Sequence, residues 1–478
     1  MTGESRDVDE VLAQLQAYRA HDAPTHGGRV LSYVYDHGRP DLDEVAAQAM
    51  RLLQPVNGLD PTTFPSVALM ESDLVEFGRT MLHGPAATGS VTSGGTESCL
   101  LAVKAARDLW VARGGRGRPR LVLSSSTHAA FHKAAHYFGL DVVVVPIDLE
   151  TGRAAAGALE AELGPQVAVV VVSAPSYPHG VVDAVADVAG AAADLGIPCH
   201  VDACVGGWVL PWWEAAGGDP LPQWDFRVRG VSSISADIHK YGYVPKGASL
   251  LLFADGELDL ARYFALTDWL GYPVVNPTML GTRSATSLAA AWAVVQTLGA
   301  DGYAVLTRRV VTATAGVLET IEGIDGLRVL GDPQGPLVAV AADEDVPPER
   351  RVDPLLWVAA VRERGFVLQG QPALSQADGT VVPHTAHLTI TPVTEGLLGE
   401  LLPALGDGAD AARGHALPSP EALSHAGIPD PLALADAARS GGDLDLPTIL
   451  SLIEALPRGE SATLLSAFLQ RFTAPRDV

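Results

Sequence analysis

Two lysines and a histidine stand close together in residues 235–246, which read SADIHKYGYVPK. The chain has only four lysines among its 32 Lys and Arg residues, and two of them, Lys240 and Lys246, lie in this stretch. A guanidinium stays protonated at any physiological pH, whereas a buried ammonium can lose its proton and become a nucleophile. Because a neutral amine forms an imine with an aldehyde, the pattern favours a chemical role for one of these lysines.

Three further features carry side chains or backbone groups that could act with such a lysine. The glycine-rich turn TSGGTES (92–98) opens a helix, where free N–H groups and the positive helix end suit a phosphate. His128 directly follows an apolar run and could stack on a flat ligand. Asp202 ends another apolar run, where a carboxylate can keep a ring nitrogen protonated. Taken singly, the glycine-rich turn also fits an ordinary loop, His128 a surface histidine and Asp202 a helix N-cap.

Together the four features match one cofactor. A phosphate cradle, a stacking ring, an acid for a pyridinium nitrogen and an imine-forming lysine are what pyridoxal 5′-phosphate requires. Lys240 and His239 follow a predicted strand end, as His128 and Asp202 do. The sequence therefore predicts a pyridoxal 5′-phosphate site with Lys240 as the attachment point.

The elements that position these residues alternate between strands and helices. Apolar runs, several of them rich in valine, predict strands buried on both faces of a parallel sheet: 120–125, 141–146, 166–172 and 197–203. Helical periodicity over 97–115, 184–196 and 284–302 separates or follows them. This alternation predicts an α/β fold.

The length of the chain predicts more than one domain. We expect an N-terminal arm with one short helix (1–60), a large cofactor-binding domain (61–300), a smaller C-terminal α/β domain (301–405) and a helical C-terminal extension (406–478). In the extension, the stretches LDLPTILSLIEAL and SATLLSAFLQRF have an amphipathic pattern.

Composition and net charge limit the classes of molecule that this chain can bind and the compartment in which it works. A net charge of −24 argues against nucleic acid and anionic membranes as partners. No apolar run approaches the ~20 residues that span a bilayer, and the polar N-terminus does not resemble a signal peptide. Cys99, Cys199 and Cys204 are few and lack a zinc-like spacing, which indicates a cytoplasmic protein without a metal site.

Longer stretches resemble a known family. VTSGGTES, HAAFHKAAHYFG, PHGVVD, IPCHVDACVGGW, FRVRGVSSISADIHKYGYVPKGASLLLF and the segment from TDW to NPTMLGTR are similar to the sphingosine-1-phosphate lyases. These lyases belong to the fold type I, or aspartate aminotransferase-type, pyridoxal enzymes and are relatives of the group II decarboxylases. The resemblance is dense over about residues 28–300 and loose beyond. It implies a large domain with a mainly parallel, seven-stranded sheet.

The resemblance also implies residue roles. Lys240 would form the imine with the cofactor, Asp202 would pair with the ring nitrogen, and His128 would stack on the ring. The cofactor phosphate would be held by Gly94, Gly95, Thr96 and His239, and by Gly281, Thr282 and Arg283 of the neighbouring subunit, which implies a homodimer with shared active sites. Tyr35 and Lys246 match positions that bind the phosphate of the substrate.

Two departures from the family pattern concern the substrate. The lyases read Asn-Pro-Leu-His-Pro where this chain reads NGLDP (57–61), so that Asp60 replaces a phosphate-facing histidine. The family's Gly-Gly-x-Tyr becomes the stretch 271–274, GYPV. We therefore expect a substrate tail that is neutral, or carries an amine or hydroxyls.

Three functions remain open from the sequence. The first is carbon–carbon cleavage of a β-hydroxy amine by a retro-aldol reaction. The second is decarboxylation of an amino acid. An arginine placed at the substrate carboxylate would favour this second function. The third is cofactor binding without turnover. In the first two cases the partner is a small-molecule amine or amino acid.

Overall fold

The computed structural model describes residues 5–417, 449–451, 454 and 456–475. Three helices precede the first strand: α1 (Val8–Arg19), α2 (Pro40–Leu53) and α3 (Pro65–Met81). The predicted arm was expected to hold one helix and holds two, α1 and α2. The start of α2 is marked by a proline in its first turn, followed by acidic residues.

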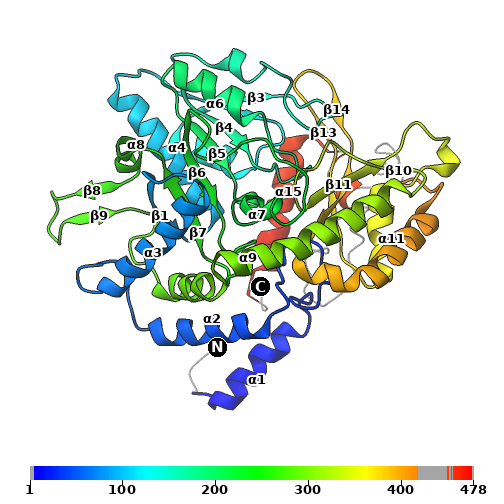
Figure 1. Ribbon diagram of the computed structural model, residues 1–478, viewed down its shortest axis with the longest axis horizontal. Helices are drawn as coiled ribbons and strands as arrows, with labels where there is room; N and C mark the ends of the chain where they lie inside the picture. The colour runs from blue at the N-terminus through cyan, green and yellow to red at the C-terminus, as the bar shows by residue number, and fades with distance from the viewer. Residues whose placement is uncertain (1–4, 418–448, 452–453, 455, 476–478) are drawn as a thin grey trace.

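A seven-stranded sheet forms the centre of the molecule (Figure 1). Its strands are β1 (Thr88–Thr92), β2 (Arg120–Ser124), β3 (Asp141–Val145), β4 (Val167–Ser173), β5 (Cys199–Asp202), β6 (Val231–Ala236) and β7 (Ser249–Phe253). Their order is β1-β7-β6-β5-β4-β2-β3, and β7 alone runs antiparallel to its neighbours. The four predicted strands are confirmed as β2, β3, β4 and β5, and the mainly parallel sheet is confirmed with them.

Alternate residues of each central strand face opposite sides of the sheet and enter different cores. On β7, Leu250 and Leu252 join one hydrophobic cluster, while Leu251 and Phe253 join another. The continuous apolar runs in the sequence arise because both faces of the sheet are covered.

Helices cover both faces. On one side lie α4 (Gly95–Ala112), α5 (Ala130–Phe138) and α8 (Gly256–Ala261). The other side is covered by α2, α3, α6 (Val185–Asp194), α7 (Leu210–Trp213) and the first half of α9 (Ala285–Glu322). The parallel strands therefore end on one edge of a three-layer structure, where the chain reaches α4, α5 and the loop carrying Lys240.

The helix predicted from 284 to 302 begins as expected but continues to Glu322. Gly299, with φ 55° and ψ −173°, bends it. The second half packs on a four-stranded antiparallel sheet, β10-β11-β15-β12, formed by β10 (Leu327–Val329), β11 (Leu337–Ala342), β12 (Gln369–Gln371) and β15 (Thr385–Thr389). Helices α10 (Pro354–Glu363) and α11 (Leu398–Ala412) complete this smaller unit.

Two short hairpins lie outside the main sheets: β8 (Phe264–Leu266) with β9 (Val274–Asn276), and β13 (Leu374–Ser375) with β14 (Val381–Val382).

Near the C-terminus, α15 (Arg458–Phe472) contains the predicted amphipathic stretch SATLLSAFLQRF. Most of the other such stretch, LDLPTILSLIEAL, lies outside the described residues. Among the helices of the described ranges, none is long and apolar enough to cross a membrane.

Candidate active site

The glycine-rich turn between β1 and α4 forms a tight cradle. Gly94 has φ 148°, a conformation that favours glycine. A Cβ atom on Gly95 would lie 2.5 Å from Oδ2 of Asp237, so that only glycine fits there. The first N–H groups of a helix have no acceptor within the helix. The cradle therefore offers donors to an anion at the edge of the sheet where the parallel strands end.

Lys240 reaches this cradle from the loop after β6. Its Nζ lies 3.0 Å from Oδ2 of Asp237, and the Asp237 side chain is almost fully buried. Burial is the largest single effect and lowers the pKa of Lys240, but Asp237 together with Tyr35, Cys204 and Asp202 outweighs it, and the net pKa lies well above the ordinary value. Asp237 was not singled out in the sequence, although its position three residues before Lys240 in SADIHK was a usable signal.

His239 lies on the same loop and faces the cradle. Its Nδ1 donates to the carbonyl of Ala248 at 2.8 Å. Its Nε2 lies 3.7 Å from Oδ2 of Asp237. Burial lowers the pKa of His239, and the Asp237 charge offsets part of that effect. This imidazole is fixed in orientation beside the glycine cradle.

Asp202 and His128 come from the ends of neighbouring elements. Asp202 is the last residue of β5 and is buried, with 7% of its surface exposed. Its Oδ1 accepts hydrogen bonds from the Cys204 N–H at 3.1 Å and from Ser235 Oγ at 3.4 Å. His128 lies just before α5, and its Nδ1 accepts from the Ala130 N–H at 3.2 Å.

These residues line a single cavity of about 350 Å³. Seven of the sequence-predicted residues meet there: Gly94, Gly95, Thr96, His128, Asp202, His239 and Lys240. The cavity is also lined by Ser93, Glu97, Cys99, Pro175, Tyr177, Cys204, Val205 and Asp237. A glycine cradle, a carboxylate, an imidazole and a primary amine thus face one space of the size that small ligands occupy.

Tyr177 is a cavity residue that sequence reasoning missed. Its hydroxyl donates to Oε1 of Gln369 on β12 at 2.6 Å, and its ring lies 4.5 Å from the ring of His387 on β15. Burial raises the pKa of its phenol. Tyr177 thereby connects the cavity to the smaller sheet, a contact between residues far apart in the sequence and therefore without a local signal.

Lys246 and Tyr35, which the resemblance assigns to a substrate phosphate, lie next to one another. The Lys246 ammonium lies 4.7 Å from the centre of the Tyr35 ring and donates to the carbonyl of His239 at 3.3 Å. Partial burial and the charge of Lys240 lower the pKa of Lys246 to about 8. Burial raises the pKa of Tyr35. A cation and a phenol therefore stand next to the loop that carries Lys240.

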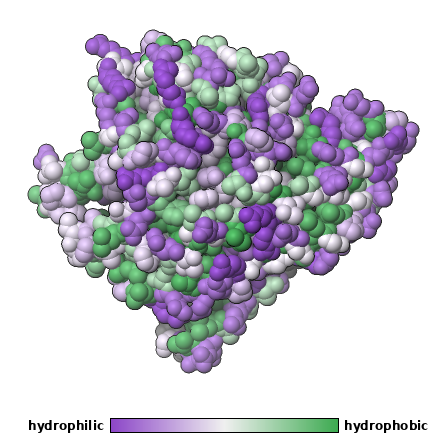
Figure 2. All heavy atoms as spheres, viewed as in Figure 1, coloured by the Kyte–Doolittle hydropathy of each residue, from purple (hydrophilic) through white to green (hydrophobic). Residues whose placement is uncertain are grey.

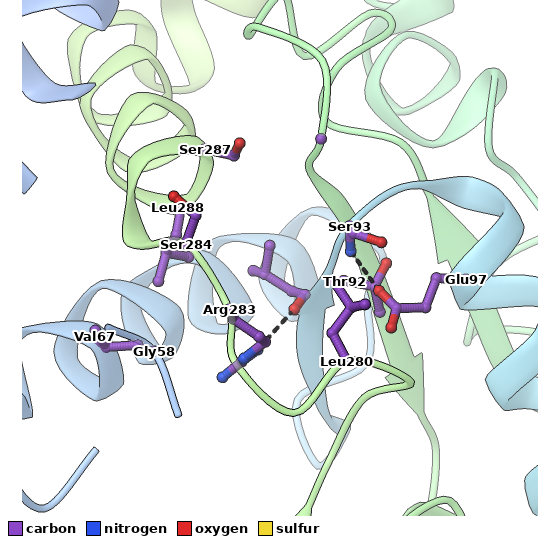
Figure 3. Close-up of a pocket in the computed structure, with 12 residues that line it drawn as sticks. Gly58, Val67, Thr92, Ser93, Glu97, Leu280, Arg283, Ser284, Ser287 and Leu288 are labelled. Carbon is purple, nitrogen blue, oxygen red and sulfur yellow. Dashed lines mark hydrogen bonds between the residues drawn. The ribbon is translucent and has the colours of Figure 1, made fainter. Parts of the chain in front are cut away.

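Arg283 lines a second, smaller pocket beside the cradle (Figure 3). Its guanidinium contacts both carboxylate oxygens of Glu71 at 3.2 Å and donates to the carbonyl of Val91 at 3.1 Å. Gly281 and Thr282 are exposed, and none of the three lines the Lys240 cavity of the same chain.

Glu97 joins the two pockets. One carboxylate oxygen accepts the Ser93 N–H at 2.6 Å, as Figure 3 shows, and the other accepts the Met279 N–H at 2.7 Å. The side chain is buried at the start of α4. It therefore links the glycine cradle to the loop that leads to Arg283.

Asp60 does not line the Lys240 cavity of its own chain. Its carboxylate accepts hydrogen bonds from the Thr62 hydroxyl at 2.6 Å, the Thr63 hydroxyl at 2.8 Å and the Thr62 N–H at 2.9 Å. The Thr62 and Thr63 hydroxyls lower the pKa of Asp60 to about 2. Within one chain, Asp60 is a permanent anion that stabilises its own turn.

Comparison with known sequences gives a consistent set of relatives. Residues 41–341 match the family model described as the pyridoxal-dependent decarboxylase conserved domain. Sphingosine-1-phosphate lyase 1 of Rattus norvegicus is 38% identical over 336 residues, which are 70% of this chain and 59% of the rat protein. The Saccharomyces cerevisiae sphingosine-1-phosphate lyase is 34% identical over 339 residues, 70% of this chain and 57% of that protein. The chain thus matches about three-fifths of the length of these relatives.

Solved structures agree with this similarity. A sphingosine-1-phosphate lyase of Burkholderia pseudomallei superimposes with a TM-score of 0.80 and 32% identity, over 86% of this chain and 92% of that chain. Glutamate decarboxylase of Lactobacillus brevis has a TM-score of 0.74 at 19% identity, over 87% of this chain and 96% of that chain. The second likeness establishes the fold alone, which is fold type I.

Proposed function

The chain belongs to the pyridoxal-dependent decarboxylase family and, within it, to the sphingosine-1-phosphate lyases, and from this membership we propose that it is a carbon–carbon lyase. Its cofactor is pyridoxal 5′-phosphate. The proposed reaction breaks the Cα–Cβ bond of a β-hydroxy amine and releases an aldehyde.

The residues of the cavity fit this cofactor. The cradle at Gly94 and Gly95 lies where α4 begins. A side chain at Gly95 would collide with the Asp237 carboxylate, so the absence of a side chain there keeps the cradle open. Gly94, Gly95, Thr96 and His239 would hold the phosphate, Lys240 the aldehyde carbon, Asp202 the ring nitrogen and His128 the ring face. When bound, the cofactor withdraws electrons from the bond that breaks. Asp202 keeps the proton on the ring nitrogen, and Lys240 Nζ can carry a proton to or from the substrate.

The observation that favours carbon–carbon cleavage is which cations line the cavity. Among the described residues that line the cavity, none is an arginine. A substrate carboxylate needs a cation or several donors when it is buried, and the amine of Lys240 is reserved for the cofactor. An amine without a carboxylate makes no such demand.

We assign the polar end of the substrate to Tyr35 and Lys246. The Tyr35 phenol and the adjacent Lys246 ammonium suit a substrate hydroxyl or an anion. Asp60 stands where the family has a histidine. In a site to which its loop contributes, the Asp60 carboxylate would repel a substrate phosphate. The proposed substrate tail is therefore uncharged or bears an amine or hydroxyls.

Offering the purified holoenzyme a panel of β-hydroxy amines, their phosphates and amino acids tests the proposal. Aldehyde, amine and carbon dioxide are measured separately. We expect aldehyde from a β-hydroxy amine and no carbon dioxide. Carbon dioxide from an amino acid, without aldehyde from the β-hydroxy amines, would identify a decarboxylase and overturn the assignment.

A homodimer with shared active sites is part of the proposal. The β8–β9 hairpin projects from the body of the molecule (Figure 1) and carries exposed apolar side chains, namely Phe264, Leu266, Trp269, Leu270 and Tyr272. Figure 2 shows apolar atoms at this projection. Contiguous exposed apolar surface indicates an interface. A second copy would cover it and bring the neighbouring 281–283 turn to the partner's cofactor phosphate.

We also propose a cytoplasmic location. All three cysteines are free thiols, and the Cys99 and Cys204 thiols lie close together without a bridge. Thiols in this state are typical of a reducing compartment.

A further inference from the structure

Two thiols and a carboxylate meet in the wall of the cofactor cavity. Cys99 lies in the second turn of α4, and Cys204 follows Asp202 by two residues after β5. The two Sγ atoms and a carboxylate oxygen of Asp202 all lie within 4.8 Å of one another. All three residues are buried and line the cavity, so that a small ion can reach them from it.

Hydrogen bonds hold two of these donors in place. The Cys204 thiol donates to Ser235 Oγ at 3.3 Å, and Ser235 Oγ donates to Oδ1 of Asp202 at 3.4 Å. The Cys204 N–H donates to the same oxygen at 3.1 Å. The arrangement is therefore fixed by β5 and β6, while Cys99 is fixed by the helix packed against them.

We propose that Cys99, Cys204 and Asp202 form a site for a thiophilic divalent cation such as Zn²⁺, and that the cation and pyridoxal 5′-phosphate exclude one another. Two thiolates and a carboxylate are donors that zinc accepts, and the cavity supplies water for the fourth position. With Zn–S bonds of about 2.3 Å, tetrahedral sulfur donors stand roughly 3.8 Å apart. The side chains therefore close by at most about 1 Å on binding.

Exclusion follows from the shared carboxylate. Asp202 is the residue assigned to the ring nitrogen of the cofactor, and a divalent cation bound to its carboxylate would withdraw the negative charge that keeps that nitrogen protonated and would repel the protonated ring. Cation binding releases the protons of the two thiols. The site gives the cell a means of controlling how much of the enzyme carries cofactor, and it does not depend on which substrate bond the enzyme breaks.

A spectroscopic titration tests the site directly. Full-length protein is reduced, desalted and freed of cofactor with hydroxylamine, then titrated with Co²⁺ or Cd²⁺. We expect a thiolate-to-metal charge-transfer band that saturates at one ion per chain. The holoenzyme should give no band. At a Cd²⁺ concentration 100 times its Kd, the apparent Kd of pyridoxal 5′-phosphate, followed by its absorbance, should rise roughly 100-fold and recover after chelation.

Variants separate this site from adventitious binding. Cys99→Ser and Cys204→Ser should each lose most of the band, whereas Cys199→Ala, which removes the remaining cysteine, should keep it. Far-ultraviolet circular dichroism checks that each variant folds. The proposal is overturned by a band that survives in both serine variants, by the absence of a band in the unmodified protein, or by cofactor and cation binding together. The last two outcomes need no variant.

Discussion

At the scale of single residues, Lys240 is the group on which the proposed chemistry depends. Its amine faces the cavity and pairs with Asp237, whereas Lys246 contacts Tyr35 and a backbone carbonyl. We expect holoenzyme treated with borohydride to carry the reduced cofactor on the peptide that contains Lys240. Lys240→Ala should remove both the yellow colour and the label, and Lys246→Ala should keep both. Mass spectrometry that finds the label on Lys246 would refute the assignment.

Asp60 provides a residue-scale test of the substrate. A carboxylate within ~4 Å of a phosphate is unfavourable by several kcal/mol at an effective dielectric of about 20. Asp60→His should therefore improve kcat/KM for phosphorylated β-hydroxy amines and lower it for unphosphorylated ones.

Asp60→Asn is the matched control for this test, because it removes the charge and keeps an acceptor for Thr62 and Thr63. If both variants lose activity equally toward every substrate, Asp60 only stabilises its turn, and the four hydrogen bonds that it accepts within the chain explain that loss.

At the scale of elements, the start of α4 and the loop before α9 are joined by Glu97. Its two carboxylate oxygens accept N–H groups from both segments. Glu97→Gln leaves one of these N–H groups facing an amide donor, and an unsatisfied buried group costs about 1–3 kcal/mol. We expect cofactor affinity to fall by roughly tenfold or more, measured by absorbance titration. Glu76→Gln, on the exposed side of α3, should have no effect.

A second element-scale link joins the smaller sheet to the C-terminal segment. His384 lies 3.4 Å from Asp353 and 3.5 Å from Glu454. Burial lowers the pKa of His384, but hydrogen bonds to the two carboxylates raise it to about 9. Because the folded pKa exceeds the ordinary value of 6.5, the stabilisation is complete below about pH 6.5 and is lost as the pH rises through 9.

This link predicts a difference between two melting profiles. The Tm of the unmodified protein should exceed that of His384→Gln at pH 6, and the gap should close by pH 10. The full effect is on the order of 3 kcal/mol. A gap that stays constant across this range would mean that the imidazole acts through packing and not through its charge.

At the scale of the whole molecule, the proposed dimer makes Arg283 and Lys240 act in the same site from different chains. Differently tagged Arg283→Ala and Lys240→Ala chains, each inactive alone, should form hybrid dimers in which one of the two sites regains both groups. Activity of purified hybrids should approach half that of the unmodified dimer.

Two controls define this experiment. A hybrid of unmodified and Lys240→Ala chains sets the activity of a dimer with a single intact site. If verified hybrids of the two variants stay inactive while this control is active, Arg283 acts only within its own chain, where it pairs with Glu71.

The sequence by itself determined four strands of the main sheet and the cofactor, and it singled out seven of the residues that line the Lys240 cavity. Runs such as 166–172 are apolar on both faces because helices cover both sides of the sheet, so that composition alone revealed β4. Gly94 and Lys240 were readable because each follows a strand, and Asp202 because it ends one, since the ends of parallel strands meet at one edge.

The tertiary structure alone decided which distant groups touch. Cys99 and Cys204 have no zinc-like spacing, yet α4 and β5 bring their thiols together. Tyr177 meets Gln369, and Glu97 meets the Met279 N–H, through contacts between segments more than 180 residues apart. Local periodicity reports how one element is buried, whereas these contacts depend on how separate elements pack. For the same reason the continuation of α9 beyond Gly299 was not predicted, because its second half is held by the smaller sheet.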